Sequence, residues 1–205
     1  TFWRGQNGLY AHYRFTENTG TTAYDIGGGS NDATVASSWT TGKLGTGYNA
    51  NSNTTYVNNP DFTIVFGNWT TMAWVKTPLA TTTASWNTLF HSSLGQLVIV
   101  DSSGVLGSYK GSFKSSGFDM DTLTDGWHHL AAVGIDNNVL FYIDGVEVGR
   151  ATAAGFTGTF TITMIGNATT TSNQEWGVFD EVRVYNVSLL ASEINGIFLR
   201  DGTHV

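Results

Sequence analysis

The segment 178–187, VFDEVRVYNV, carries three charged residues in a chain of which only 12% of the residues are charged. β-branched and aromatic residues surround them, which is typical of a strand, where successive side chains point to opposite faces. The alternation places Asp180 with Val182 and Val184 on the more apolar face, which we expect to lie against the core. An inward carboxylate is costly unless it is paired, bound to a metal or hydrogen-bonded. Two interpretations stay open: Asp180 is a Ca²⁺ ligand, or it accepts backbone N–H groups at a sheet edge.

The other titratable residues in strand-like segments are predicted to be structural. Glu181 and Arg183 share the opposite face of the same segment, and we expect a solvated ion pair there. His128 and His129 are adjacent in a second strand-like segment, so their side chains point to opposite faces and cannot chelate one ion together.

Hydrolysis of a glycosidic bond needs two carboxyl groups, about 5–9.5 Å apart, on either side of the bond. The five Glu residues are scattered over separate segments: Glu17, Glu147, Glu175, Glu181 and Glu193. The sequence also has no Gly-X-Ser-X-Gly elbow, no cysteine and no zinc-ligand spacing. We therefore predict that the protein is not an enzyme.

Aromatic residues near loops are candidates for sugar binding, because pyranose rings have apolar faces that stack on aromatic rings. The aromatic residues assigned to packing are Trp39, Trp74 and Trp127. Three others lie close to turn residues and are predicted to be exposed and to bind the ligand: Trp86, Tyr109 and Trp176. We expect the loops 77–86, 102–117 and 169–176 to line one rim of the molecule.

The composition excludes several classes of partner. A net charge of −7 with only nine Lys and Arg residues argues against nucleic acid and against an anionic membrane surface. The longest aliphatic run, 97–100, is far too short to span a bilayer. Without cysteine, the fold must be held by its core and by any bound metal instead of disulfides. The chain begins with Thr and has no leader, so we interpret it as a mature or excised domain.

Short alternating segments separated by turn residues predict an all-β protein. The predicted strands are 9–15, 72–77, 86–91, 96–101, 127–135, 139–143, 146–150, 160–165 and 178–187. The Asp144-Gly145 pair between two of them predicts a tight hairpin. A helical pattern occurs only at 189–194, so we expect an antiparallel β-sandwich or barrel.

Several motifs together carry a family resemblance. They are GLYAHYRFTENTGTTAYDIGGGSNDATV, DGWHHLAAV, VLFYIDGVEVG, MIGN and FDEVRVYNVSLLASEI, in this order. The chain thereby resembles the laminin G-like, concanavalin A-like jelly-roll domains over about residues 8–199. The resemblance implies a sandwich of two antiparallel sheets with the first and last strands side by side. We predict one such domain over 8–205 after an extension or linker, 1–7. Because Leu190 replaces the usual Ser or Thr of a capping box, we expect only a short, frayed C-terminal helical turn.

The resemblance also places Asp180 beside the N-terminal strand and its glycine-rich loop, 25–32. Glycine lets backbone carbonyls turn towards an ion, and the loop and its surroundings are rich in oxygen ligands. The predicted structural Ca²⁺ site consists of Asp180, Asp25, Asn31 and Glu17.

Together these features predict a non-catalytic carbohydrate-binding or adhesion module, stabilised by Ca²⁺, of a larger exported or surface protein. Its partner would be a glycan or a surface protein, without nucleic acid or membrane insertion, at an extracellular, cell-surface or virion-surface location. The alternative is a structural or protein-interaction domain, such as a decoration on a virion or cell surface.

Overall fold

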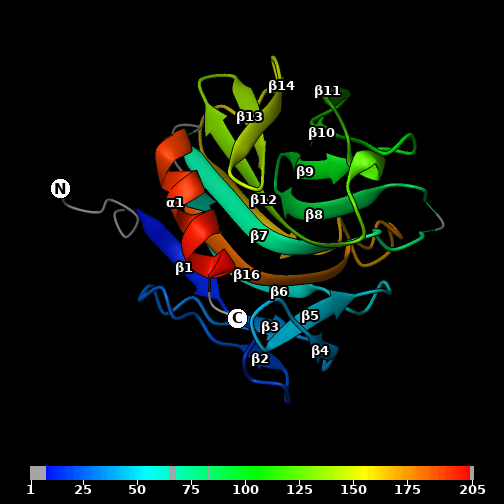
Figure 1. Ribbon diagram of the computed structural model, residues 1–205, viewed down its shortest axis with the longest axis vertical. Coiled ribbons are helices and arrows are strands. Elements are labelled where there is room, and N and C mark those ends of the chain that lie inside the picture. Colours follow the sequence, from blue (N-terminus) through cyan, green and yellow to red (C-terminus); the bar gives the residue numbers. More distant parts are fainter. Residues whose placement is uncertain (1–7, 65–67, 83, 204–205) are drawn as a thin grey trace.

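The alternating segments of the sequence pair into two antiparallel sheets, which stack as a sandwich in the computed structural model (Figure 1). The structure describes residues 8–64, 68–82 and 84–203, so the predicted extension 1–7 lies outside the described residues. The predicted antiparallel jelly roll of two sheets is confirmed, and a helix follows it at the C-terminus.

The first sheet is built around the long strand near the C-terminus. Its strands are β1 (Leu9–Tyr13), β4 (Trp39–Thr41), β5 (Thr46–Ala50), β7 (Trp69–Thr77), β12 (Gly126–Ile135), β13 (Asn138–Ile143), β14 (Val146–Ala151) and β16 (Gly177–Tyr185). Their order is β14-β13-β12-β7-β16-β5-β4, and β1 also pairs with β16. Leu9 lies opposite Tyr185, and Tyr13 lies opposite Val182, so the first and last strands are neighbours as predicted.

The second sheet has the order β11-β10-β9-β8-β15-β6-β3-β2. Its strands are β2 (Thr22–Ala23), β3 (Ala33–Val35), β6 (Val57–Ile64), β8 (Asn87–Ser92), β9 (Gly95–Val100), β10 (Val105–Tyr109), β11 (Phe113–Asp119) and β15 (Phe160–Ile165). A short 3₁₀ helix, Met120–Thr122, follows β11.

The predicted Asp-Gly hairpin joins β13 and β14. Ile143 pairs with Val146, and both turn residues have positive φ, 49° at Asp144 and 80° at Gly145. Two successive positive φ angles are the requirement of a type I′ turn, and Gly meets it without steric cost.

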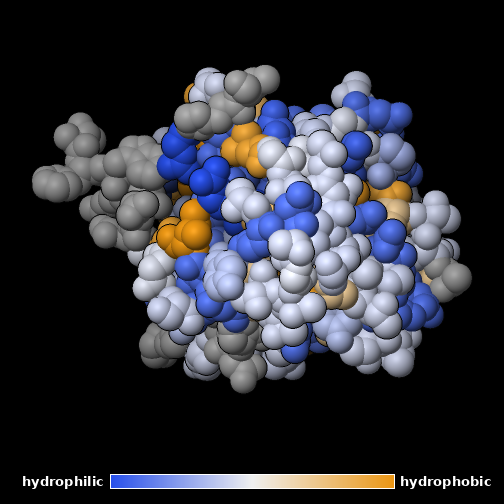
Figure 2. Space-filling model, turned by 90° about the horizontal axis from the view of Figure 1, so that it is seen from below, coloured by the Kyte–Doolittle hydropathy of each residue, from blue (hydrophilic) through white to orange (hydrophobic). Residues whose placement is uncertain are grey.

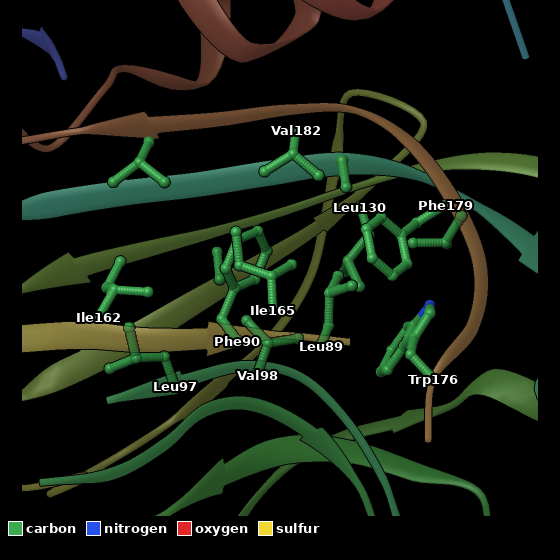
Figure 3. Close-up of a cluster of buried hydrophobic side chains, with 14 of the residues drawn as sticks. Leu89, Phe90, Leu97, Val98, Leu130, Ile162, Ile165, Trp176, Phe179 and Val182 are labelled. Carbon is green, nitrogen blue, oxygen red and sulfur yellow. The ribbon is translucent and has the colours of Figure 1, made fainter. Parts of the chain in front are cut away.

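The main core fills the space between the sheets. Figure 3 shows side chains from both sheets meeting there, including Phe90 and Leu97 from the second sheet and Phe179 and Val182 from the first. All four side chains are buried. Removal of this apolar surface from water is the main force that holds the two sheets together.

A second apolar cluster lies between the outer face of the first sheet and the helix α1 (Ala191–Gly202), drawn in red in Figure 1. Ile194 and Ile197 of the helix pack there against residues such as Met72 and Val133. The prediction of a short, frayed turn is therefore wrong: the helix has 12 residues although Leu190 supplies no side-chain cap. Tertiary packing of an amphipathic face stabilises such a helix more than its cap does.

Candidate ligand-binding site

A β-bulge in β16 decides where Asp180 points. Its pairing with β7 shifts register between Asp180 and Arg183, and Glu181 has a φ of 51°. Phe179 and Val182 consequently both belong to the main core. Asp180 instead pairs with Trp74, which packs on the helix side of the sheet. The prediction that Asp180 shares the core face of Val182 is wrong, because the extra residue of a bulge interrupts the alternation.

Asp180 is nevertheless buried, and both its carboxylate oxygens accept backbone hydrogen bonds. The N–H of Leu44 donates to Oδ2 at 2.9 Å, and the N–H of Glu181 donates to Oδ1 at 2.7 Å. Burial raises the pKa of Asp180 to about 7, while the bond from Leu44 acts in the opposite direction. These contacts match the alternative interpretation, in which the carboxylate satisfies backbone groups.

Asp25 organises the glycine-rich loop against β1. Its Oδ1 accepts the backbone N–H groups of His12 at 2.9 Å and Gly27 at 2.7 Å, and its Oδ2 accepts that of Asn31 at 3.1 Å. Asn31 in turn donates its side-chain amide to the carbonyl of Tyr10. The loop is thus held by its own hydrogen bonds.

The predicted calcium ligands do not form one coordination shell. Asp180 bonds to the segment between β4 and β5, whereas Asp25 and Asn31 bond to β1 and their own loop. Glu17 accepts the N–H of Tyr24 at 2.9 Å through one oxygen. Within the described ranges, no group of three or more His, Cys, Asp and Glu side chains is placed to hold a metal ion. Calcium binding by these four residues remains a prediction that this arrangement does not support.

The charged pair on β16 is buried, so the prediction of a solvated pair is wrong. Arg183 donates to Glu181 at 2.7 Å and to Asp201 of α1 at 2.6 Å. Burial alone would raise the pKa of Glu181, but its hydrogen bond with His12 and the positive charge of Arg183 lower it below its ordinary value. The cluster joins β1, β16 and the helix.

His129 packs between aromatic rings on the side of the first sheet that faces α1. Its ring is fully buried, with centroids 5.5 Å from Trp74 and 6.1 Å from Phe198. Burial lowers the pKa of His129 to about 4, so the ring is neutral at pH 7. His128 instead contacts Asp144 at 2.8 Å. These contacts agree with structural roles for both histidines.

Trp176 and Trp39 are both packing residues, although only Trp39 was predicted to be one. Trp176 is fully buried and lies beside Leu89 and Phe179 in the core (Figure 3), so its predicted role as an exposed ligand contact is wrong. Backbone hydrogen bonds of Trp176 with Ala80 and Gly166 hold it in place just before β16 begins. Trp39 is half-buried against Tyr48, in agreement with the packing role predicted for it.

Trp86 and Tyr109 come together at a pocket on the second sheet. The pocket has a volume of about 300 Å³ and is lined by Trp86, Gln96, Ile99, Tyr109 and Gln174. The ring centroids of Trp86 and Tyr109 are 6.1 Å apart, and their planes are nearly perpendicular at 89°. Ile99 is buried, lines the pocket together with both rings, and lies opposite Gly107 and Thr88 in the neighbouring strands.

The neighbouring strands explain how the rings are held. Phe113 lies opposite Tyr109 in the β10–β11 hairpin, and its ring contacts Trp86 with a centroid distance of 5.5 Å. The ring of Phe113 packs against Gly107, and a Cβ atom on Gly107 would lie only 2.6 Å from that ring. Gly107 therefore leaves the room that Phe113 needs to support Trp86.

The loop before β16 supplies Gln174 in a fixed orientation. Thr88 donates its backbone N–H to the carbonyl of Gln174 at 2.9 Å and its hydroxyl to Oε1 of the same residue at 2.8 Å. The N–H of Gln174 donates to the buried Asn167 at 3.2 Å. The bond from Thr88 fixes the orientation of the Gln174 amide, whose nitrogen is a hydrogen-bond donor.

The three segments predicted to share a rim are thus connected, but the prediction that 102–117 is a loop is wrong, because it contains β10 and the start of β11. Asn87 donates to the carbonyls of Ala80 and Glu175, which joins the first loop to the third, while Tyr109 brings in the second. Sequence reasoning missed Gln96 and Gln174. Gln96 reaches the site only because β9 and β10 pair it with Tyr109, a register that no local signal reveals.

The chemistry of the pocket is neutral. Its lining offers two aromatic rings, two amides, a phenol hydroxyl and an aliphatic floor, and none of the five lining residues is charged. Such a combination of apolar surface with a few polar groups is typical of a small-molecule site. None of these five described residues carries a carboxyl group, whereas hydrolysis of a glycosidic bond uses two.

In the described part of the chain, no helix is both long and apolar enough to cross a membrane. None of the curated proteins matches the sequence. The sequence model described as Concanavalin A-like lectin/glucanases superfamily matches residues 51–195.

Solved structures with the same fold include domain 4 of AbnA, a GH43 extracellular arabinanase from Geobacillus stearothermophilus, in complex with arabinotriose. The TM-score is 0.65 at 22% identity, over 92% of this chain and 97% of that one. Trypanosoma rangeli sialidase has a TM-score of 0.71 at 18% identity, and the match covers 96% of this chain but only 34% of the sialidase. The binding domain of Paraclostridial Mosquitocidal Protein 1 has a TM-score of 0.62 at 13% identity, and the match covers 95% of this chain and 52% of that chain. At these identities the likeness establishes the fold.

Proposed function

Because this chain belongs to the concanavalin A-like lectin/glucanase superfamily, we propose that it is a non-catalytic carbohydrate-binding module of a larger exported or surface protein. The observation that carries the proposal is the pocket at Trp86 and Tyr109, where two aromatic rings meet two amide side chains. Aromatic faces stack on pyranose or furanose rings, and amides bond to sugar hydroxyls.

Two further points support the proposal. The pocket lining lacks carboxylates, which favours binding over hydrolysis. The domain of the extracellular arabinanase has the same fold, is matched over 97% of its length and was solved with arabinotriose. This likeness supports both a glycan partner and an extracellular setting as part of a larger protein.

The alternative, a structural or protein-interaction domain, would use a surface of another kind. Seen from below (Figure 2), apolar residues form small separate patches within a surface of intermediate to hydrophilic character. On this face, for the residues that the structure describes, the pattern differs from the extended apolar patch that marks many protein interfaces.

Glycan binding by a Trp86→Ala variant tests the proposal. An array of immobilised glycans identifies a binding glycan, and calorimetry then measures its affinity for the wild type and the variant. Loss of a central aromatic contact costs about 2 kcal/mol or more, so we expect affinity to fall by roughly 30-fold.

Tyr24→Ala is the matched control, because Tyr24 is 55% exposed and follows β2, at the opposite edge of the second sheet. It should leave affinity unchanged. A folded wild-type protein that binds no array glycan, or equal affinities for the wild type and Trp86→Ala, would reject the proposal in favour of the structural alternative.

A further inference from the structure

We infer that the pocket at Trp86 and Tyr109 selects uncharged sugar units and rejects acidic ones such as uronic and sialic acids. This inference rests on the proposed function and adds the class of ligand. It follows from the charges and hydrogen-bonding groups around the pocket.

The first step is the absence of a cation in the lining. An acidic sugar brings a carboxylate, which proteins usually recognise with the paired N–H donors of Arg or with Lys. The lining residues Trp86, Gln96, Ile99, Tyr109 and Gln174 offer only neutral groups. A carboxylate would exchange water for neutral amides and aromatic rings, which is costly for an ion.

The nearest lysines in the sequence are directed elsewhere. Lys110 follows Tyr109, but its ammonium group donates to the carbonyl of Gly155 at 2.6 Å. Lys114 pairs with Ser108, the strand position between Gly107 and Tyr109, and therefore falls on the opposite face of the β10–β11 hairpin. Neither lysine compensates an anion in the pocket. The net charge of −7 further disfavours the approach of an anion.

The second step is the pattern of donors and acceptors. Gln174 has an amide nitrogen that donates, and the bond from Thr88 to its Oε1 at 2.8 Å holds the amide in place. Gln96 and Tyr109 can each donate and accept. A sugar hydroxyl also donates and accepts, so adjacent hydroxyls of a neutral sugar satisfy this set, whereas a carboxylate could use only the donors.

Matched glycans on one array test the inference. Each neutral glycan, such as N-acetyllactosamine or an arabinose or galactose oligosaccharide, is printed beside the same glycan with a terminal sialic or uronic acid. We expect the wild type to bind neutral members at least tenfold more tightly than their acidic counterparts. This margin corresponds to the loss of charge-assisted contacts for the carboxylate.

A gain-of-function variant provides the second arm. Gln96→Arg places a guanidinium group in the wall of the pocket, and Gln96→Met serves as the uncharged control of similar length. We expect Gln96→Arg, unlike Gln96→Met, to raise affinity for the acidic members by about tenfold relative to the wild type.

The outcomes separate the two claims. Binding that depends on Trp86 but is equal or stronger for acidic members would overturn the inference and leave the proposed function standing. An unchanged preference in Gln96→Arg would also count against the inference, because added charge should then have altered selection. Failure of every glycan to bind in a Trp86-dependent way would instead overturn the proposed function.

Discussion

Replacement of Arg183 by Met should strongly destabilise the protein, because the guanidinium group links two buried carboxylates. It contacts Glu181 at 2.7 Å and Asp201 at 2.6 Å, and the side chains of these two acids are only 2% and 4% exposed. Met retains much of the apolar stem but leaves both charges without their shared partner. Breaking a buried ion pair by removing one side costs about 3–5 kcal/mol.

The assay is urea unfolding followed by circular dichroism, with a thermal melt beside it. For a domain of this size, 1 kcal/mol corresponds to about 2–4 °C, so the melting temperature should fall by roughly 6–20 °C. The matched control is Arg150→Met. Its ion pair with Glu147 spans 3.2 Å, but the two side chains are 54% and 39% exposed. An exposed pair contributes at most about 1 kcal/mol.

A double variant tests the cause. Arg183→Met combined with Asp201→Leu removes one of the two buried carboxylates that lose Arg183, so it should recover part of the lost stability. The reasoning about the buried cluster is refuted if Arg183→Met lowers the free energy of unfolding no more than Arg150→Met does. It is also refuted if the double variant loses as much stability as the two single variants lose together.

Three further predictions concern the pocket, pH and metal. Thr88→Val removes the hydroxyl that orients Gln174, so the affinity for the glycan, measured by calorimetry, should fall about fivefold. Thr88→Ser keeps the hydroxyl and should restore the affinity. Equal affinities for the wild type and Thr88→Val would show that Thr88 does not position the amide. The pKa of His129 is about 4 in the folded protein and near 6.5 in the unfolded chain. As the pH falls from 6.5 to 4, the unfolded chain therefore binds the proton first. The free energy of unfolding should fall by up to about 3 kcal/mol over this range. His129→Leu should lack this part of the pH dependence in urea unfolding, and an unaltered slope would contradict it. Because the predicted calcium ligands are engaged in separate hydrogen bonds, EDTA should leave the melting temperature unchanged, whereas a clear decrease that added Ca²⁺ reverses would contradict our description of those residues.

The fold could be predicted because its main signals are local. Alternation at 127–135 and 139–143 marks two strands that pair as β12 and β13, and the Asp144-Gly145 turn marks the hairpin of β13 and β14; the structure confirms both pairings. Strands such as β5 and β11 escaped prediction because they are rich in Gly, Asn and Ser, which are typical of turns. Their pairing depends on neighbouring strands.

The errors at the site have a common origin in tertiary structure. Glu181 contacts β1, its neighbours in β16 pair with β7, and Arg183 binds Asp201 of α1. A glutamate with positive φ has no signature in sequence. Trp176 precedes a glycine and resembled a loop residue, yet it enters the core where β16 begins. Trp86 and Tyr109 could be identified as candidates, but only the pairing of strands shows that they share a pocket.

The most direct test of the account is a titration of the ¹⁵N-labelled protein with the strongest-binding neutral glycan, followed by NMR chemical shifts. The account predicts that the largest changes occur at the amides of Gln96, Ile99, Tyr109 and Gln174 and at the indole of Trp86, with none in α1. Changes that cluster on another surface, while these five residues remain unaffected, would contradict it.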